Sequence, residues 1–179
     1  MNIILIGYRA TGKTTVARLI ADWIGWEAVD ADVEIEHRAG KTIAAIFADE
    51  GERGFRDREA EVIAALCARD RLVIAAGGGA PLREENRAAM REGGVVVWLK
   101  ARPETIHGRM RGDATTVTRR PSLTGHDPLA EIVALLQERE PIYRAAAREI
   151  VDTEGRSPKG VAAEILERVK PLPDGGDLL

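Results

Sequence analysis

The stretch GYRATGKTT, from Gly7 to Thr15, holds two glycines, a lysine and a threonine at fixed spacing directly after the apolar run at 2–6. It fits the pattern G-x-x-x-x-G-K-[ST] between a strand and a helix. In such a loop, backbone N–H groups and the positive end of the helix converge on phosphate oxygens. Lys13 would reach the β- and γ-phosphates, and the Thr14 hydroxyl would ligate Mg²⁺. The alternative is a chance glycine-rich turn.

A phosphate loop alone does not separate a kinase from a GTPase. A GTPase would also need D-x-x-G and N/T-K-x-D to recognise guanine. The D-x-x-G at Asp152–Gly155 comes too late in the chain, and N/T-K-x-D is absent from the sequence. The late position of D-x-x-G and the absence of N/T-K-x-D therefore argue against a GTPase that acts as a guanine-nucleotide switch.

Two carboxylates close the short apolar stretch at 27–30, in the sequence VDAD. If this strand adjoins the first one, Asp30 and Asp32 lie close to the phosphate loop. The apolar runs at 71–76 and 94–100 do not end in an acidic residue, so we expect Asp30 to hold Mg²⁺, directly or through water. Asp32 would accept a hydrogen bond from an attacking hydroxyl, or it would cap the helix that follows.

Further residues could bind a small acceptor. Arg56 and Glu59 are three apart, so they share one helix face, either in a site or as a solvated ion pair. Three glycines at 77–79 follow a buried strand, which indicates close approach of a small substrate to the backbone, with a loose turn as the alternative. Arg139 would clamp a carboxylate, or it would be an ordinary arginine on a helix surface.

Arginines crowd the stretch at about 110–127, which lacks apolar periodicity. We expect a flexible lid here, because such a segment can close over phosphates, expel water and bring an arginine to the transferring group. A solvated loop is the alternative. The arginines in or beside this stretch are Arg109, Arg111, Arg119 and Arg120.

Short apolar runs alternate with helical stretches along the chain, which predicts parallel strands with right-handed crossovers. The runs lack polar alternation, as expected for strands that are covered on both faces. We therefore expect an α/β protein, a three-layer α/β/α sandwich with a central parallel sheet, and ligands at the carboxyl ends of its strands. The expected strands are 2–6, 27–30, 71–76, 94–100 and 148–152. The expected helices are 12–25, 33–39, 43–49, 52–69, 83–92, 103 to about 112, 128–147 and 158–170.

Size and composition suit one domain over residues 1–170, with a disordered tail at 171–179. The net charge of −3 shows no basic excess for nucleic acid, and no apolar run is long enough to span a membrane. There is one cysteine, Cys67, for which we expect a buried, unreactive thiol in a reducing compartment. We expect a cytoplasmic monomer, since no leader pattern or surplus apolar patch is visible.

Together these segments resemble shikimate kinases. The phosphate loop is common to many families, whereas D-x-D, F-R-x-x-E, G-G-G and an R-P lid in this order are much more specific. The resemblance covers about residues 1–170 and implies a P-loop kinase fold that transfers the γ-phosphoryl group of ATP to the 3-hydroxyl of shikimate, with Mg²⁺. The matching segments are GYRATGKTT, VDADVEIE, GERGFRDRE, VIAAGGG, RRPSLTG, REPIYR and VDTEGRSP.

The resemblance also implies residue roles. The shikimate contacts would be Asp32, Arg56, Gly78 and Arg139, supported by Glu59, Gly77 and Gly79. ATP would be held by Ala10, Thr11, Gly12, Lys13, Thr14 and Thr15, by Arg109, Arg156 and Pro158 around adenine, and by the lid arginine Arg120. Lys13, Asp32 and Arg120 would be catalytic, and Thr14 and Asp30 would hold the metal. The lid is slightly longer than the family pattern, which leaves Arg111 open as an alternative to Arg109.

Two other functions remain open on the sequence alone. One is a different small-molecule kinase, such as a gluconate kinase, which would not need two arginines aimed at a carboxylate beside a triple glycine. The other is a nucleotide-binding regulator without catalysis. Acceptor-dependent release of ADP distinguishes a kinase from such a regulator.

Overall fold

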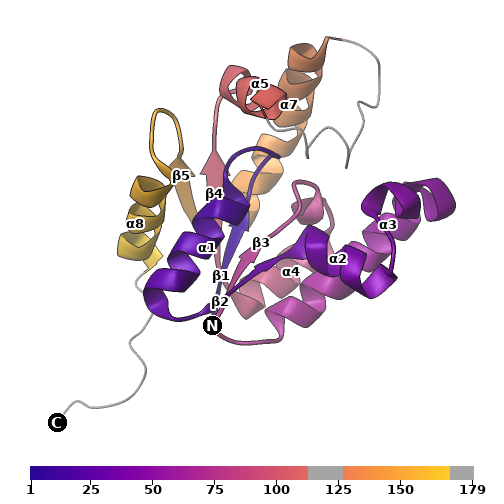
Figure 1. Cartoon of the computed structure of the whole chain (residues 1–179), viewed down its shortest axis with the longest axis horizontal. Helices are drawn as coiled ribbons and strands as arrows, with labels where there is room; N and C mark the ends of the chain where they lie inside the picture. The colour runs from indigo at the N-terminus through magenta and orange to yellow at the C-terminus, as the bar shows by residue number, and fades with distance from the viewer. Residues whose placement is uncertain (113–126, 170–179) are drawn as a thin grey trace.

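The computed structural model describes residues 1–112 and 127–169. Five strands form one parallel sheet in the order β2-β3-β1-β4-β5, and their carboxyl ends all meet at one edge (Figure 1). This confirms the predicted α/β class with a central parallel sheet. The strands are β1 (Asn2–Ile6), β2 (Glu27–Asp30), β3 (Leu72–Ala75), β4 (Gly94–Lys100) and β5 (Glu149–Asp152).

Helices cover both faces of the sheet, as predicted. The helices are α1 (Lys13–Ile24), α2 (Ala31–Ala39), α3 (Ile43–Cys67), the short η1 (Ala80–Leu82), α4 (Glu84–Gly93), α5 (Pro103–Gly112), α7 (Pro128–Ala146) and α8 (Pro158–Val169). Helices α1 and α8 lie on one face, and α2, α3 and α4 lie on the other (Figure 1). Helices α5 and α7 stand at the carboxyl edge of the strands and pack against each other there.

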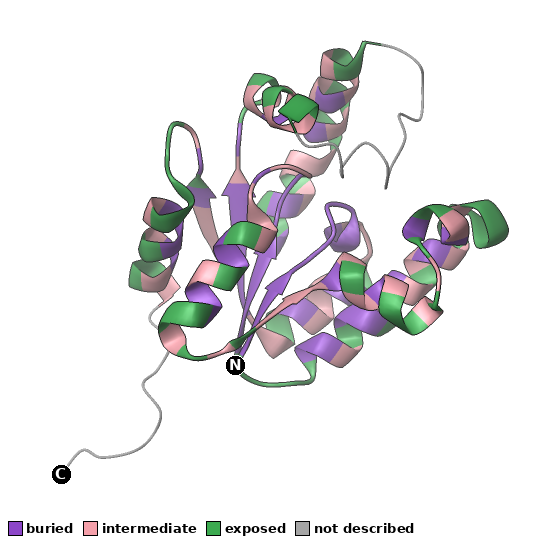
Figure 2. Ribbon diagram, viewed as in Figure 1, coloured by how far each residue is buried: buried purple, intermediate pink, exposed green. Residues whose placement is uncertain are grey.

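The central strand β1 explains this layering. Successive side chains of a strand point to opposite faces. Ile3 and Leu5 pack against α1 and α8, and Ile4 and Ile6 pack against the helices of the other face. All four are fully buried, so a strand that is apolar on both sides needs a cover on both sides (Figure 2).

Two local predictions are corrected. The helical spacing of the sequence places Trp23 on one apolar face of the helix at 12–25 with Val16, Leu19 and Ile20, which predicts that it packs inward, but Trp23 is 47% exposed. The buried stripe of α1 includes Ala17 and Ala21, whose small side chains let the helix turn that face onto the sheet and leave Trp23 at the margin. The predicted helices at 43–49 and 52–69 form the two arms of α3, which is kinked at Gly51, where φ is 68°.

Cys67 is the free cysteine of the chain, and it is buried at the end of α3. Burial raises the pKa of its thiol to about 11, because the charged thiolate is poorly solvated there. The expectation of an unreactive thiol therefore agrees with its surroundings.

Among residues 1–112 and 127–169, we find no helix with the length and apolar character that crossing a bilayer requires.

The side chain of Asn2 joins four backbone groups, from the segment at 67–72 and from Gly93, at the amino edge of the sheet. Its amide nitrogen donates to the carbonyl oxygens of Arg69 (2.7 Å), Gly93 (3.1 Å) and Cys67 (3.4 Å). Its amide oxygen accepts from the backbone N–H of Leu72 at 2.9 Å. Asn2 is fully buried, so these backbone groups depend on it for hydrogen bonds.

We predict that Asn2→Leu lowers the free energy of unfolding by about 3 kcal/mol, because it leaves several buried backbone groups unpaired. Urea denaturation measures this loss. Asn86→Leu is the matched control, since buried Asn86 makes a side-chain hydrogen bond to the carbonyl of Ala80 (2.9 Å) and should cost about 1 kcal/mol. Equal losses in the two variants would contradict the prediction.

Candidate functional site

The phosphate loop links the end of β1 to the start of α1. Gly7 has φ 137°, and a Cβ atom there would lie 2.5 Å from the carbonyl oxygen of Leu99. Gly12 has φ 94° and precedes the first turn of α1, and Ala10 is also left-handed, with φ 59°. The two glycines therefore allow the tight loop that the sequence predicts.

Lys13 lies over this loop. Its Nζ donates to the carbonyl oxygens of Gly7 (2.9 Å) and Tyr8 (2.7 Å). The buried Thr11 hydroxyl donates to the same Tyr8 oxygen at 2.8 Å. The ammonium group is thus held beside the loop, at the amino end of α1, where Thr15 is exposed in the first turn. Positive charge and a helix N-terminus together favour a bound anion here.

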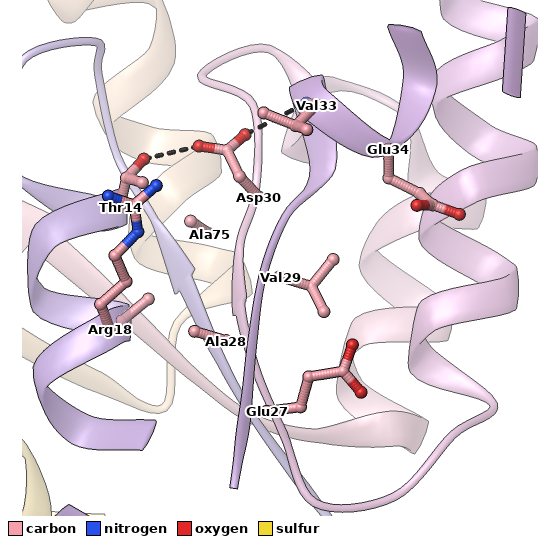
Figure 3. Close-up of a pocket in the computed structure, with 10 residues that line it drawn as sticks. Thr14, Arg18, Glu27, Ala28, Val29, Asp30, Val33, Glu34 and Ala75 are labelled. Atoms are coloured by element: carbon pink, nitrogen blue, oxygen red, sulfur yellow. Dashed lines mark hydrogen bonds between the residues drawn. The ribbon is translucent and has the colours of Figure 1, made fainter. Parts of the chain in front are cut away.

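Thr14 and Asp30 meet across the carboxyl edge of the sheet. The Thr14 Oγ1 donates to Asp30 Oδ2 at 2.6 Å (Figure 3). We expected this closeness only if β2 adjoined β1, but β3 lies between them. The contact forms because α1 packs over both β3 and β2 and carries Thr14 across to Asp30.

The other carboxylate oxygen of Asp30 caps α2. It accepts from the backbone N–H groups of Asp32 (3.0 Å) and Val33 (3.4 Å). The alternative that Asp32 caps this helix is therefore wrong, because the helix begins two residues earlier than predicted. Asp32 lies in the first turn of α2, beside the Thr14–Asp30 pair and half-buried.

The Thr14–Asp30 pair fits Mg²⁺ bound with a nucleotide. Within residues 1–112 and 127–169, no group of three or more His, Cys, Asp or Glu side chains could hold a metal ion by itself. Mg²⁺ in nucleotide sites prefers hard oxygen ligands, and it commonly takes one or two from the protein and the rest from phosphates and water. A hydroxyl and a carboxylate beside a phosphate loop meet that need.

A pocket of about 230 Å³ opens next to this pair, between α1 and the β2–α2 connection (Figure 3). Charged side chains from both sides line it, including Arg18, Glu27 and Glu34. Neither the glycine turn at 77–79 nor Arg56 or Arg139 is among its lining residues. The pocket therefore borders the Thr14–Asp30 pair and is separate from the groups expected to bind an acceptor.

Arg56 and Glu59 form a shielded ion pair on α3. Arg56 Nη1 lies 2.6 Å from Glu59 Oε2, and the two side chains are 12% and 1% exposed. A Cβ atom on Gly79 would lie 2.4 Å from both terminal nitrogens of Arg56. The Arg56–Glu59 pair is therefore not a solvated ion pair, because the guanidinium group lies against the glycine turn, although Arg56 Nη2 also lies 3.7 Å from Oε1 of the exposed Glu52.

The glycine turn at 77–79 is buried and is packed on two sides. A Cβ atom on Gly78 would lie 3.4 Å from the carbonyl oxygen of Gly7 and 3.6 Å from the backbone nitrogen of Arg9. On the other side, Gly79 faces Arg56. The alternative of a loose turn is wrong, since the turn is buried between the phosphate loop and Arg56, and at Gly79 the arginine occupies the space that a side chain would need.

Arg139 lies on α7, near the phosphate loop. Its guanidinium carbon is 5.8 Å from the centre of the Tyr8 ring. Its Nε is buried and has no hydrogen-bond partner among the residues that the structure describes. A buried donor of this kind costs free energy when it is unpaired, which points to an anionic or polar ligand.

Arg109 joins the phosphate loop to the loop after β5. It donates to the carbonyl oxygen of Ala10 (3.4 Å) and to the carbonyl oxygen of Thr153 (3.3 Å). Arg111, by contrast, is exposed. In the loop itself, Arg156 pairs with Glu164 and donates to the Gly160 carbonyl oxygen at 3.1 Å.

Glu154, which the sequence analysis missed, fastens α5 to the same loop. Its carboxylate accepts from the Arg102 backbone N–H (2.7 Å) and the Thr105 hydroxyl (2.9 Å). These bonds, the first above all, lower the pKa of the carboxyl group below its usual value.

The remaining predicted site residues lie after this loop or outside the described residues. Pro158 starts α8 directly after the loop. Arg119, Arg120 and most of the expected lid lie outside the described residues.

Comparisons with known proteins agree with this geometry. The family model for shikimate kinase matches residues 9–170. The chain is 51% identical to a shikimate kinase of Symbiobacterium thermophilum, covering 95% of this chain and 97% of that protein. It is 45% identical to one of Rhodopirellula baltica, covering 93% and 89%.

A solved structure also matches the chain over nearly its whole length. The shikimate kinase from Acinetobacter baumannii in complex with shikimate superposes with a TM-score of 0.88 at 38% identity, covering 96% of this chain and 95% of that one. The sequence match and the structural match both extend over nearly the whole chain, which therefore belongs to the shikimate kinase family.

Proposed function

We propose that this protein transfers the γ-phosphoryl group of ATP to the 3-hydroxyl of shikimate, giving shikimate 3-phosphate and ADP. The observation that carries the proposal is the closeness of the glycine turn to the phosphate loop, since a Cβ atom on Gly78 would lie 3.4 Å from the Gly7 carbonyl oxygen. Phosphoryl transfer needs the attacking oxygen close to, and in line with, the transferred group. An alcohol bound at that turn would lie directly beside the phosphates.

On the nucleotide side, the backbone from Ala10 to Thr15 would hold the phosphates, and Lys13 would neutralise their charge. Thr14 and Asp30 would hold Mg²⁺, which offsets further phosphate charge when it is bound. Arg109, with Arg156 on the loop after β5 and Pro158 at the start of α8, would enclose the adenine. The contact of Arg109 with Ala10 and Thr153 supports this assignment. Arg120 would reach the transferring group from the lid.

On the acceptor side, Arg56 and Arg139 would bind the shikimate carboxylate by charged hydrogen bonds. The buried, unpartnered Nε of Arg139 supports this role. Glu59 would hold Arg56 in place through their 2.6 Å ion pair. The turn from Gly77 to Gly79 would form the floor of the site.

Asp32 would orient the attacking hydroxyl and take its proton late in a loose transition state. Its place in the first turn of α2, beside the Thr14–Asp30 pair, supports this role. The chemistry then depends mainly on positioning and on neutralisation of charge, because the protein itself forms no covalent bond to substrate.

The wider setting is also a proposal. We infer a single kinase domain over residues 1–170 that acts as a monomer in the cytoplasm on small molecules, without nucleic acid or membrane. The single, buried cysteine supports a reducing compartment. The net charge of −3 suits anionic substrates only where arginines gather locally, as at the acceptor side. Size-exclusion chromatography with light scattering tests the oligomeric state.

A coupled assay of ADP release tests the function. The purified protein is supplied with ATP and Mg²⁺, and with shikimate, gluconate or no acceptor. Release that depends on shikimate supports the proposal. Release that depends on gluconate would identify a different small-molecule kinase, and no acceptor dependence would identify a nucleotide-binding regulator.

We predict that Asp32→Asn lowers kcat by at least about a hundredfold and leaves ATP affinity within a factor of about two, because only the acceptor hydroxyl loses its partner. Steady-state kinetics and calorimetry measure the two effects. The matched control is Glu34→Gln, since Glu34 lies in the same turn and pairs with Arg38 on the surface. A near-normal kcat in Asp32→Asn would refute the assignment.

We predict that Gly79→Ala raises the KM for shikimate by about tenfold, with the KM for ATP little changed. The added methyl group would push the Arg56 guanidinium out of place, although the backbone of Gly79 (φ −98°) suits alanine. Gly108→Ala is the control, because a Cβ atom there meets nothing within 4 Å. Equal kinetics in the two variants would show that the glycine turn does not position Arg56.

A further inference from the structure

We propose that Tyr143 is a positioning residue, which fixes the glycine turn at 77–79 and thereby sets the affinity for shikimate. The proposal rests on the proposed function, because it assigns the turn to the acceptor. Tyr143 itself need not touch substrate. It acts through the backbone of Gly78.

The contact is a buried hydrogen bond between distant parts of the chain. The Tyr143 hydroxyl donates to the carbonyl oxygen of Gly78 at 2.5 Å, across 65 positions of sequence. Tyr143 is fully buried, and its ring packs against Trp98 with centres 5.7 Å apart. Because the ring is enclosed by the core, the hydroxyl is held at a fixed place.

The glycine turn needs such a fixed point. Glycine has more backbone freedom than any other residue, and three in succession give the turn little stiffness of its own. A trans peptide is planar, so its C=O and N–H groups point in opposite directions. A hydrogen bond to the Gly78 carbonyl therefore also sets the direction of the Gly79 N–H, beside the Arg56 guanidinium.

The same helix carries a second proposed acceptor group. Arg139 is four residues before Tyr143, so both lie on one face of α7. Pro141, between them, cannot donate a backbone hydrogen bond, which weakens the helix at this point. The bond from Tyr143 ties the segment beyond the proline to the glycine turn, and it keeps Arg139 in register with that turn.

Other hydrogen bonds hold the phosphate loop, where the nucleotide is proposed to bind. Lys13 and Thr11 hold the phosphate loop through the Tyr8 carbonyl, and Arg109 holds it through Ala10. None of these bonds involves Tyr143. Loss of the Tyr143 hydroxyl should therefore loosen the acceptor site and leave the nucleotide site in place.

Tyr143→Phe tests the proposal, since it removes one oxygen and keeps the ring. We expect the KM and Kd for shikimate to rise about tenfold, while the KM for ATP and kcat change by less than about threefold. Ile63→Val is the control for lost stability, because Ile63 is fully buried in the same core cluster. It should lower the melting temperature and leave the ratio of the two KM values unchanged.

The outcomes separate this proposal from the function itself. If the wild-type protein phosphorylates shikimate and Tyr143→Phe keeps both KM values, or raises both equally, Tyr143 does not position the acceptor site. If the wild-type protein does not act on shikimate, the proposed function fails first, and the positioning role for shikimate falls with it.

A measurement that keeps Tyr143 covers the case in which Tyr143→Phe does not fold. The chain has two tyrosines, so incorporation of 3-fluorotyrosine gives two fluorine resonances. The Tyr143 signal is the one that remains in Tyr8→Phe. Shikimate alone should shift this signal, whereas a signal that stays unmoved at saturating shikimate would overturn the proposal.

Discussion

The close passage of Gly7 beneath the carbonyl oxygen of Leu99 is the constraint on which the site depends. No side chain fits at residue 7, because a Cβ atom would lie 2.5 Å from that oxygen. The chain can therefore leave the central strand and turn at once into the phosphate loop. The glycine turn lies close to the Gly7 carbonyl oxygen, which is 3.4 Å from where a Cβ atom on Gly78 would lie, so the proposed nucleotide and acceptor sides adjoin there.

Much of the fold follows from the sequence, because the strands are short apolar runs and the helices have clear ends. Predictions failed where the local sequence allowed more than one helix start or more than one buried helix face. Asp30 and Asp32 could each cap α2, and only the start of the helix at Ala31 decides between them. Trp23 looked like a core residue, but the alanines of α1 determine which face packs on the sheet.

The candidate site was partly visible in the sequence. The phosphate loop, the Thr14 and Asp30 pair and the Arg56–Glu59 pair could be proposed from spacing, since each lies within one element or at strand ends. Tyr143 and Glu154 could not, because their partners lie 65 and 52 or 49 positions away along the chain. Glu154 lies among polar residues in DTEGR and Tyr143 lies in PIYRA, and neither local sequence distinguishes the residue from many others. The groups that the structure shows close to the glycines are Arg56 and the phosphate loop, and the approach of a substrate to this turn stays a prediction.

The position of Arg56 over Gly79 has a consequence for how the family can evolve. Any side chain at residue 79 would collide with the guanidinium, and a shorter residue at 56 would remove that collision. The two sites are thus linked by exclusion of volume rather than by attraction. Lineages that keep the arginine should keep the glycine, and substitutions at the two positions should arise as correlated pairs.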